Sequence, residues 1–370
     1  MLTRRTLLAV SAAMAVSGCA GGPMRSGAAP DDPALRPRAD PGWDAWVAAF
    51  RPRAAAAGIR AGVIDDAFRG AGFLPGVVER DRNQTEFQRS FEDYLAIVAP
   101  EPKVQAGRAA FARQSGALSA IESRYGVPAE IVCAIWGVES NYGTRRGDIP
   151  TISALSTLAY DGRRGAFFER QLIAALRILQ AGDVTPDRMV GSWAGAMGHT
   201  QFIPTSYLQS AVDFTGDGRR DIWSEDPTDA LASAAAYLAG AGWQRSASWA
   251  VEDPAGALTP DPGGPSFRTG ANFRVIKRYN NSDSYALGVG YLADRIAGGG
   301  PLRQGFGPDR YGLTIGQRQE LQRRLTAAGF DTGGTDGVIG PNSRAAIAAF
   351  QASRGLPATG DPSPALLATL

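Results

Sequence analysis

One stretch of the sequence decides the fold: Tyr125-Gly-Val-Pro-Ala-Glu-Ile-Val-Cys-Ala-Ile-Trp-Gly-Val-Glu139-Ser-Asn-Tyr-Gly143. Pro128 suits the first turn of a helix, where its missing N–H leaves no hydrogen bond unmade. Residues 131–136 are apolar on every face of such a helix, so we expect the helix to be buried on all sides. Glu139 would then lie at the C-terminal end of a buried helix.

The chain around this helix carries the same helical signature from Trp43 onward. Apolar residues recur at three- and four-residue spacing, and glycines such as Gly126 and Gly182 follow several of these runs, as is typical of helix C-termini. The alternation that predicts strands is scarce, with one short hairpin expected near 247–277. The predicted fold class is therefore mainly α, with helices at 43–57, 104–125, 128–141, 151–160, 165–181, 202–211 and 227–240.

The composition excludes several classes of protein. The 370 residues hold 38 Lys and Arg against 36 Asp and Glu, and this balance argues against nucleic-acid binding, which requires a basic excess. His199 is the only histidine, and Cys19 and Cys133 are the only cysteines. Histidine-rich and cysteine-rich zinc sites are therefore impossible. Carboxylates remain as candidate catalytic groups, and Cys133 is expected to be a buried free thiol.

Residues 1–18 have the pattern of an export signal. Arg4 and Arg5 precede an apolar run that is shorter than the roughly 20 residues needed to cross a membrane. The run ends in Val16-Ser17-Gly18-Cys19, which resembles a bacterial lipoprotein processing site, in which the cysteine becomes the lipidated first residue. The adjacent arginines also resemble a twin-arginine signal. An ordinary cleaved signal with an incidental cysteine is the alternative.

The lipoprotein resemblance implies a location. The mature protein would be periplasmic and lipid-anchored through Cys19, its only contact with a membrane. Ala20 rather than aspartate follows the cysteine, which by the same resemblance favours the inner leaflet of the outer membrane. Residues 19–42 are rich in Gly, Pro and Ala and lack periodic apolar positions, so they are predicted to be a flexible tether.

Glu139 is the candidate catalytic group. Desolvation at the end of an apolar helix raises a carboxyl pKa, and the helix C-terminus disfavours the negative charge as well. A carboxyl that is protonated near neutral pH can act as a general acid at a glycosidic oxygen. The alternative is a solvent-exposed glutamate that only ends the helix.

Four separate blocks resemble the lytic murein transglycosylase B family. They occur in family order within residues 43–297, and the resemblance implies that this segment is a lysozyme-like helical catalytic domain. The blocks are Gly137-Val-Glu139-Ser-Asn-Tyr-Gly143, Gly195-Ala-Met-Gly-His-Thr-Gln201-Phe-Ile-Pro204-Thr-Ser-Tyr207, Asp213-Phe-Thr-Gly-Asp-Gly-Arg-Arg-Asp221-Ile-Trp223 and Tyr279-Asn-Asn-Ser-Asp-Ser-Tyr285-Ala-Leu-Gly.

The resemblance also implies roles for single residues. Glu139 matches the family's acid/base, and Ser192 and Gln201 match residues that position the substrate. A tyrosine offers a flat face to a sugar ring and a hydroxyl at its edge; packing and turn formation are the alternative explanation for such residues. The residues that match the lining of the family's glycan groove are Tyr94, Tyr237, Tyr279, Asn280 and Tyr285.

The implied reaction is a non-hydrolytic cut of peptidoglycan during cell-wall turnover or remodelling. Glu139 would protonate the leaving oxygen of the MurNAc–GlcNAc β-1,4 bond while the 2-acetamido group of the substrate stabilises the cationic centre. The resulting carboxylate would take the proton of the C6 hydroxyl, giving a 1,6-anhydroMurNAc end. No cofactor takes part. The alternatives are a hydrolytic muramidase and a non-catalytic peptidoglycan-binding lipoprotein.

The third block also has the spacing of an EF-hand loop. Its residues at positions 1, 3, 5, 7 and 9 are Asp213, Thr215, Asp217, Arg219 and Asp221, and position 7 needs only a backbone carbonyl, so arginine is allowed there. Position 12, normally a bidentate glutamate, is Ser224, and Glu225 or Asp226 could take its place. The family resemblance implies a structural calcium here; a metal-free Asp/Gly turn is the alternative.

The C-terminal part is predicted to be a separate unit. Residues 298–312 are rich in Gly and Pro and indicate a linker. Residues 313–370 contain Leu321-Gln-Arg-Arg-Leu325, Asp336-Gly-Val-Ile-Gly340 and Ala345-Ala-Ile-Ala-Ala-Phe350-Gln351, and they resemble a small three-helix peptidoglycan-binding domain. The implied partner is the peptidoglycan glycan strand, and retention on the wall would raise the local substrate concentration.

Overall fold

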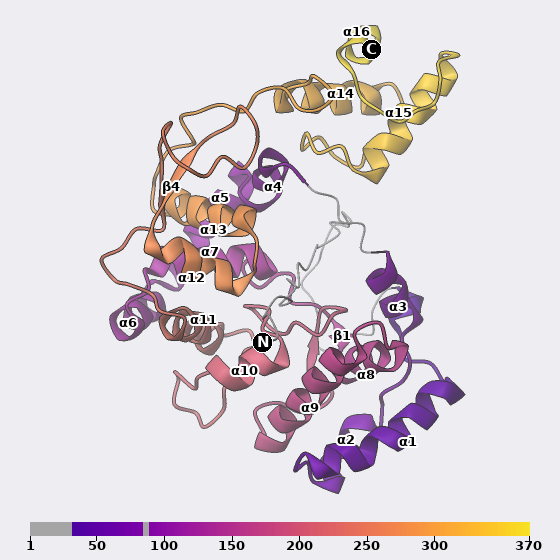
Figure 1. Ribbon diagram of the computed structural model, residues 1–370, viewed down its shortest axis with the longest axis vertical. Helices are drawn as coiled ribbons and strands as arrows, with labels where there is room; N and C mark the ends of the chain where they lie inside the picture. The colour runs from indigo at the N-terminus through magenta and orange to yellow at the C-terminus, as the bar shows by residue number, and fades with distance from the viewer. Residues whose placement is uncertain (1–31, 84–88) are drawn as a thin grey trace, which may run out of the picture.

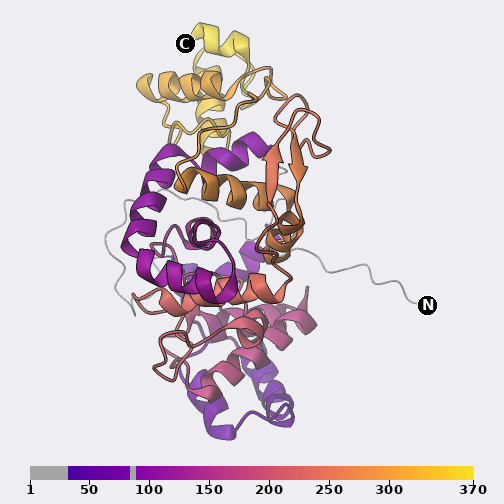
Figure 2. The same cartoon turned by 90° about the vertical axis from the view of Figure 1, so that its left-hand side faces the viewer.

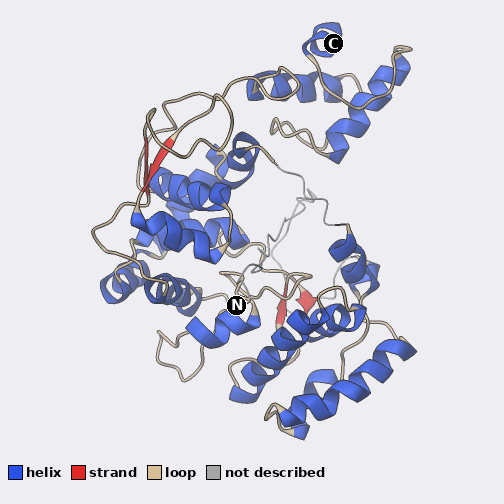
Figure 3. Ribbon diagram, viewed as in Figure 1, coloured by secondary structure: helices blue, strands red, loops and turns tan. Residues whose placement is uncertain are grey.

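The computed structural model describes residues 32–83 and 89–370 of the chain. Within them helices dominate, as Figure 3 shows, so the mainly α prediction is confirmed. The predicted signal peptide and Cys19 lie outside the described residues. Residues 32–42 of the predicted tether are anchored at several points, because Leu35 is buried, the backbone of Arg38 pairs with that of Phe73, and a helix begins at Pro41.

Thirteen α-helices precede the predicted linker and three follow it in the described part of the chain. The first group is α1 (Pro41–Ala56), α2 (Ala61–Phe68), α3 (Pro75–Arg82), α4 (Phe91–Val98), α5 (Glu101–Arg113), α6 (Ser115–Tyr125), α7 (Ala129–Ser140), α8 (Thr151–Asp161), α9 (Gly165–Ala181), α10 (Pro204–Ser210), α11 (Thr228–Gly240), α12 (Ala271–Tyr279) and α13 (Asp283–Ile296). The second is α14 (Ile315–Ala327), α15 (Pro341–Ser353) and α16 (Pro364–Thr369).

The strands of the described residues form two short antiparallel pairs. One joins β1 (Ile149–Pro150) to β2 (Val190–Gly191), and the other joins β3 (Ala250–Glu252) to β4 (Phe267–Thr269). The second pair is the predicted hairpin, but residues 271–279 form α12 instead of continuing it. The predicted helix 104–125 is also two helices, because the backbone turns at Gln114 while apolar residues on both sides stay buried.

The helices before the linker pack around two apolar clusters, which we call the first and second lobes (Figure 1). The first lobe is built from α4, α5, α6, α7, α11, α12 and α13, and the second from α1, α2, α3, α8, α9 and α10 with the loop that ends at Trp223. Tyr237 and Tyr279 pack against both clusters. These two tyrosines therefore mark the junction between the lobes.

Helix α7 lies inside the first lobe, as the sequence predicted. Its residues from Ile131 to Gly137 are all buried, and its neighbours include α5, α6, α11 and α13. Cys133 is fully buried as a free thiol. The helix ends at Ser140, which places Glu139 where the helix leaves the apolar interior.

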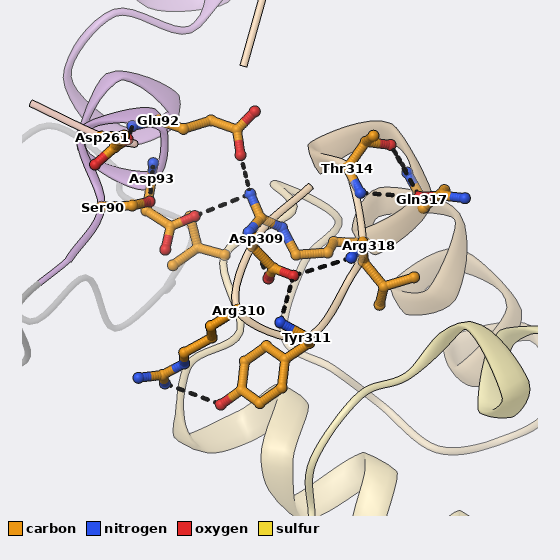
Figure 4. Close-up of polar contacts among 12 residues, drawn as sticks. Ser90, Glu92, Asp93, Asp261, Asp309, Arg310, Tyr311, Thr314, Gln317 and Arg318 are labelled. Carbon is orange, nitrogen blue, oxygen red and sulfur yellow. Dashed lines mark hydrogen bonds and ion pairs between the residues drawn. The ribbon is translucent and has the colours of Figure 1, made fainter. Parts of the chain in front are cut away.

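The C-terminal unit, α14 to α16, has its own apolar core and meets the first lobe through charged groups. Arg318 of α14 is 2% exposed and forms ion pairs with Glu92 at 2.5 Å, Asp93 at 3.1 Å and Asp309 at 2.8 Å (Figure 4). Glu92 and Asp93 belong to α4, whose first N–H groups are held by the Asp261 carboxylate. Figure 2 shows the unit stacked on the first lobe. A buried ionic cluster thus joins the two parts.

Candidate active site

Glu139 lies at the end of α7 with one of its oxygens held. The hydroxyl of Tyr285, in the first turn of α13, donates a hydrogen bond of 2.6 Å to Glu139 Oε1. Desolvation raises the pKa of Glu139 to about 7, while the Tyr285 hydrogen bond and the positive charge of Lys103 act in the opposite direction. This carboxyl can therefore hold a proton near neutral pH and can also release it.

A group of aromatic rings surrounds this carboxyl. Tyr285 and Tyr279 are stacked, with ring centroids 6.4 Å apart and planes 12° from parallel. Tyr279 contacts Tyr237 edge-on at 5.1 Å. Their hydroxyls donate to backbone carbonyls, that of Tyr279 to Thr200 and that of Tyr237 to Arg278, both at 2.7 Å. Three of the predicted groove tyrosines therefore form one continuous set.

Tyr94 joins the set from α4. Its ring packs over Gly288 of α13, where an added Cβ would come within 2.6 Å of the ring. Burial raises the pKa of the Tyr94 hydroxyl, and the negative charge of Glu139 adds to the rise. The structure therefore brings Tyr94 to the same side of the first lobe as Glu139 and Tyr285, although 45 residues separate it from Glu139 in the chain (139 − 94).

The predicted polar residues divide by how much hydrogen-bonding capacity they have left. Ser192 Oγ accepts from the N–H of Ala196 at 3.1 Å and keeps its own proton for a ligand. The amide nitrogen of Gln201 donates to the carbonyls of Arg146 at 3.0 Å and Gly198 at 2.8 Å, so its amide oxygen is the atom left to accept a hydrogen bond from a substrate. Asn280 Oδ1 is buried and forms no hydrogen bond within the described part of the chain.

The backbone of this region is strained. Among the described residues, the non-glycine residues with positive φ are Asn141 at 51°, Tyr142 at 57° and Gln201 at 51°. Two of them directly follow the Glu139-Ser140 pair and the third is a predicted substrate residue. Left-handed backbone in ordinary residues costs about 1–3 kcal/mol each and is concentrated at functional sites, so this clustering marks the region independently of its side chains.

Sequence reasoning missed one charged group of the site. Lys103, in the first turn of α5, lowers the pKa of Glu139, and burial lowers its own pKa to about 8. It is one of two lysines in the chain, the other being Lys277. That scarcity was the available signal, but nothing in the sequence places Lys103 near Glu139.

The predicted cation loop brings together a different carboxylate from those expected at position 12. Oxygens of Asp213, Asp217 and Asp229 lie within 4.8 Å of one another. Glu225 pairs with Arg146 instead, and Asp226 accepts from Thr228. The Asp221 carboxylate accepts from the N–H groups of Trp223 and Ser224. Three converging carboxylate oxygens fit the oxygen-rich surroundings that calcium prefers, with buried Asp229 in the place of the missing glutamate.

None of the helices in the described residues is both long enough and apolar enough to cross a membrane. The chain matches two protein families. Residues 42–258 and 252–294 match the family described as Transglycosylase SLT domain, and residues 315–370 match a peptidoglycan binding domain.

Relatives and solved structures agree with these matches. Membrane-bound lytic murein transglycosylase B of Escherichia coli (strain K12) is 34% identical over 239 residues, covering 54% of this chain and 65% of that protein. The aligned part is thus slightly under two thirds of the relative's length. SltB3 of Pseudomonas aeruginosa, solved in complex with NAG-NAM-pentapeptide, is 44% identical with a TM-score of 0.70, covering 89% of this chain and 100% of that one.

A third likeness is to a structure that was solved with calcium. The E. coli lytic transglycosylase SLT35, solved in complex with calcium, is 29% identical with a TM-score of 0.57, covering 70% of this chain and 93% of that one. The lysozyme-like fold expected of the catalytic part is confirmed by these likenesses. With the family match covering well over half of its residues, the chain belongs to the Transglycosylase SLT domain family.

Proposed function

We propose that this protein is a peptidoglycan lytic transglycosylase that cuts the MurNAc–GlcNAc β-1,4 bond and leaves 1,6-anhydroMurNAc ends. The observation that carries the proposal is the state of Glu139, whose pKa near 7 is set by burial, one phenol and one lysine. A single carboxyl that can hold and release a proton at neutral pH suits a reaction in which one group acts first as acid and then as base.

The two carboxyl oxygens of Glu139 have different roles in the proposed reaction. Because Tyr285 donates to Oε1, Oε2 carries the proton that goes to the leaving glycosidic oxygen. The substrate's 2-acetamido group then stabilises the positive centre at C1. The Glu139 carboxylate, favoured by Tyr285 and Lys103, removes the proton of the C6 hydroxyl, and O6 closes onto C1. Proton and bond counts balance without water.

The tyrosines and polar side chains would bind the glycan around this carboxyl. Half-buried Tyr279 can offer part of its apolar face to a sugar ring, whereas Tyr285 is only 3% exposed and acts through its hydrogen bond to Glu139. The buried unpaired oxygen of Asn280 can accept from a hydroxyl or N-acetyl N–H, and Ser192 can donate to a carbonyl. The complexes of SltB3 with NAG-NAM-pentapeptide and NAG-anhNAM-pentapeptide support a substrate of the same chemistry for this chain.

Two further assignments complete the proposal. The C-terminal unit would hold the enzyme on peptidoglycan, supported by its family match. Cys19, outside the described residues, would carry a lipid anchor at the inner leaflet of the outer membrane. The E. coli relative is named membrane-bound. Asp213, Asp217 and Asp229 would hold a structural calcium that stiffens the loop between α10 and α11 and takes no part in bond cleavage.

The test is a digest of purified sacculi by the soluble protein from residue 20 onward, read by mass spectrometry. Wild type should release 1,6-anhydroMurNAc products and Glu139→Gln should release none. Glu130→Gln, the same chemical change at the other end of α7, is the matched control and should keep full activity.

Each other outcome identifies a different function. Reducing MurNAc ends would identify a hydrolytic muramidase. Binding to sacculi with neither product would identify a non-catalytic wall-binding protein. Activity that survives in Glu139→Gln would remove Glu139 from the mechanism.

A further inference from the structure

His199 is a buried polar group that the proposed mechanism does not use. It is the only histidine of the chain and is 3% exposed. Its ring lies between the two lobes: the indole N–H of Trp136, in α7, donates to Nδ1 at 3.1 Å, and Nε2 lies 2.7 Å from the carbonyl oxygen of Ser224. Trp136 belongs to the apolar cluster of the first lobe, and Trp223, the neighbour of Ser224, to that of the second.

The partners of the ring determine which nitrogen carries the proton. An indole N–H can only donate, so Nδ1 must be bare; a carbonyl oxygen can only accept, so Nε2 must carry the hydrogen. A second proton, on Nδ1, would face the N–H of Trp136. Burial opposes a positive charge on the ring, and so does Arg146, 3.2 Å from Nε2; the hydrogen bond to the Ser224 carbonyl and the charges of Glu225 and Asp221 favour it. Burial lowers the pKa of His199 to about 4, so the ring is neutral at pH 7.

The backbone of His199 holds the strained segment beside Glu139. Ser140 Oγ donates to the His199 carbonyl at 2.6 Å and accepts from the N–H of Gly143 at 3.0 Å. These bonds bracket Asn141 and Tyr142, the two left-handed residues after Glu139. The backbone N–H of His199 donates to the carbonyl oxygen of Ile222, in the second lobe, at 3.0 Å. The left-handed Gln201 follows two residues after His199.

We infer that His199, as a neutral imidazole with its proton on Nε2, is a positioning residue for Glu139. Its ring ties α7 to the loop of the second lobe and so fixes the His199 backbone groups that hold the left-handed turns beside Glu139 and Gln201. The inference rests on the proposed role of Glu139 for its effect on turnover. The tautomer and the link between the lobes do not depend on that role.

The first test needs no substrate. A long-range ¹H–¹⁵N spectrum of the wild-type protein contains signals of one imidazole, and its two nitrogens distinguish the tautomers. The Nε2–H neutral form is expected at pH 7. An Nδ1–H tautomer or a charged ring at that pH would overturn the inference, whatever the enzyme does.

The second test is kinetic. His199→Phe keeps the ring volume and removes both hydrogen bonds, and His199→Asn restores an acceptor at the position of Nδ1. Because a displacement of about 1 Å can cost roughly 100-fold in rate, His199→Phe should lower kcat by between about 10- and 100-fold with little change in KM, and should move the alkaline limb of the kcat–pH profile. His199→Asn should recover part of the loss.

A matched pair of tryptophan variants separates positioning from general loss of packing. Trp136→Phe deletes the N–H that reaches His199, whereas Trp43→Phe deletes a buried indole N–H that donates to Ser156 at 3.2 Å in the second lobe. Only Trp136→Phe should lower kcat, and its effect should not add to that of His199→Phe. Equal effects of the two tryptophan changes, or a folded His199→Phe with wild-type kcat, would contradict the inference.

Failure of the proposed function would look different. If Glu139→Gln kept its activity, the Nε2–H tautomer and the coupling between Trp136 and His199 in thermal unfolding would still be measurable.

Discussion

The Tyr285 hydroxyl and the Glu139 carboxyl lie 2.6 Å apart, and this contact fixes which carboxyl oxygen is available. Within the described part of the chain Oε2 forms no hydrogen bond, so it alone can present a proton to a ligand. The donor also sets the acidity of the group, since a hydrogen bond to a carboxylate stabilises its charged form and lowers its pKa. The following experiments separate these two effects.

Tyr285→Phe should raise the pKa of Glu139 above its present value near 7, because burial remains while the hydrogen bond is lost. The pH above which kcat/KM falls should therefore be higher in this variant than in the wild type. The rate should drop by between about 10- and 100-fold, the value of a hydrogen bond to a charged group of about 1.5–3 kcal/mol. Tyr291→Phe, on the same helix but bonded to Arg295, is the control and should leave the profile unchanged.

Lys103→Met should also raise the pH at which kcat/KM falls on the alkaline side of its pH profile. The lysine charge favours the Glu139 carboxylate, so its removal raises the pKa of Glu139. The other lysine offers a matched control: Lys277→Met removes a cation that pairs with Asp283 at 2.7 Å. The measurement is a pH–rate profile of each variant with sacculi as substrate. Equal shifts in both variants would show that Lys103 affects the pKa of Glu139 no more than the distant Lys277 does.

Arg318→Met should destabilise the contact between the C-terminal unit and the first lobe by about 3–5 kcal/mol, because the carboxyls of Glu92 and Asp93 lose their buried cation. Thermal unfolding measures the loss. Arg324→Met, which breaks an exposed pair with Glu320 on the same helix, should cost no more than about 1 kcal/mol. Equal losses would mean that the cluster contributes little.

The pH dependence of this loss follows from the raised pKa values of Glu92 and Asp93, which burial causes. A carboxyl whose pKa is higher in the folded state favours folding below its unfolded pKa, and this contribution is lost as the pH rises through the folded pKa. Without Arg318 these carboxyls should bind protons more readily. The difference in unfolding temperature between wild type and Arg318→Met should therefore shrink from pH 8 to pH 5.

Calcium at millimolar concentration should raise the unfolding temperature of the wild-type protein and should bind measurably in calorimetry. Asp217→Asn should abolish both effects, because it removes an exposed member of the carboxylate group without touching the backbone bonds of buried Asp229. Asp226→Asn, just outside that group, should keep them. Identical behaviour of all three proteins in calcium would remove the ion from the proposal.

The features that could be predicted from the sequence are local or carried by family resemblance. The apolar run before Glu139 predicted a buried helix because no face of it could be exposed without cost, and α7 confirms this. The short helices α2, α3 and α4 have eight residues each, too few for a clear period, and were not predicted. Tyr94 and Tyr285 were named only because they match the family's groove.

Other features arise from contacts that local patterns do not encode. The pair of Arg318 and Glu92 joins residues 226 positions apart. Asp229 lies beyond residues 213–224, which have the spacing of an EF-hand loop. Nothing in the sequence predicts left-handed backbone at Tyr142, because a tyrosine seldom adopts it, and the neighbouring Ser140 is held by the carbonyl of His199, 59 residues away in the chain.

Helix α4 gives the contact at Arg318 a mechanical consequence. It is eight residues long, about 12 Å, yet it carries Tyr94, which interacts electrostatically with Glu139, and, in the preceding two positions, the carboxylates that pair with Arg318. A force applied to the C-terminal unit and carried by the Arg318 ion pairs would reach the ring of Tyr94 through less than one turn of α4, because Tyr94 directly follows Glu92 and Asp93.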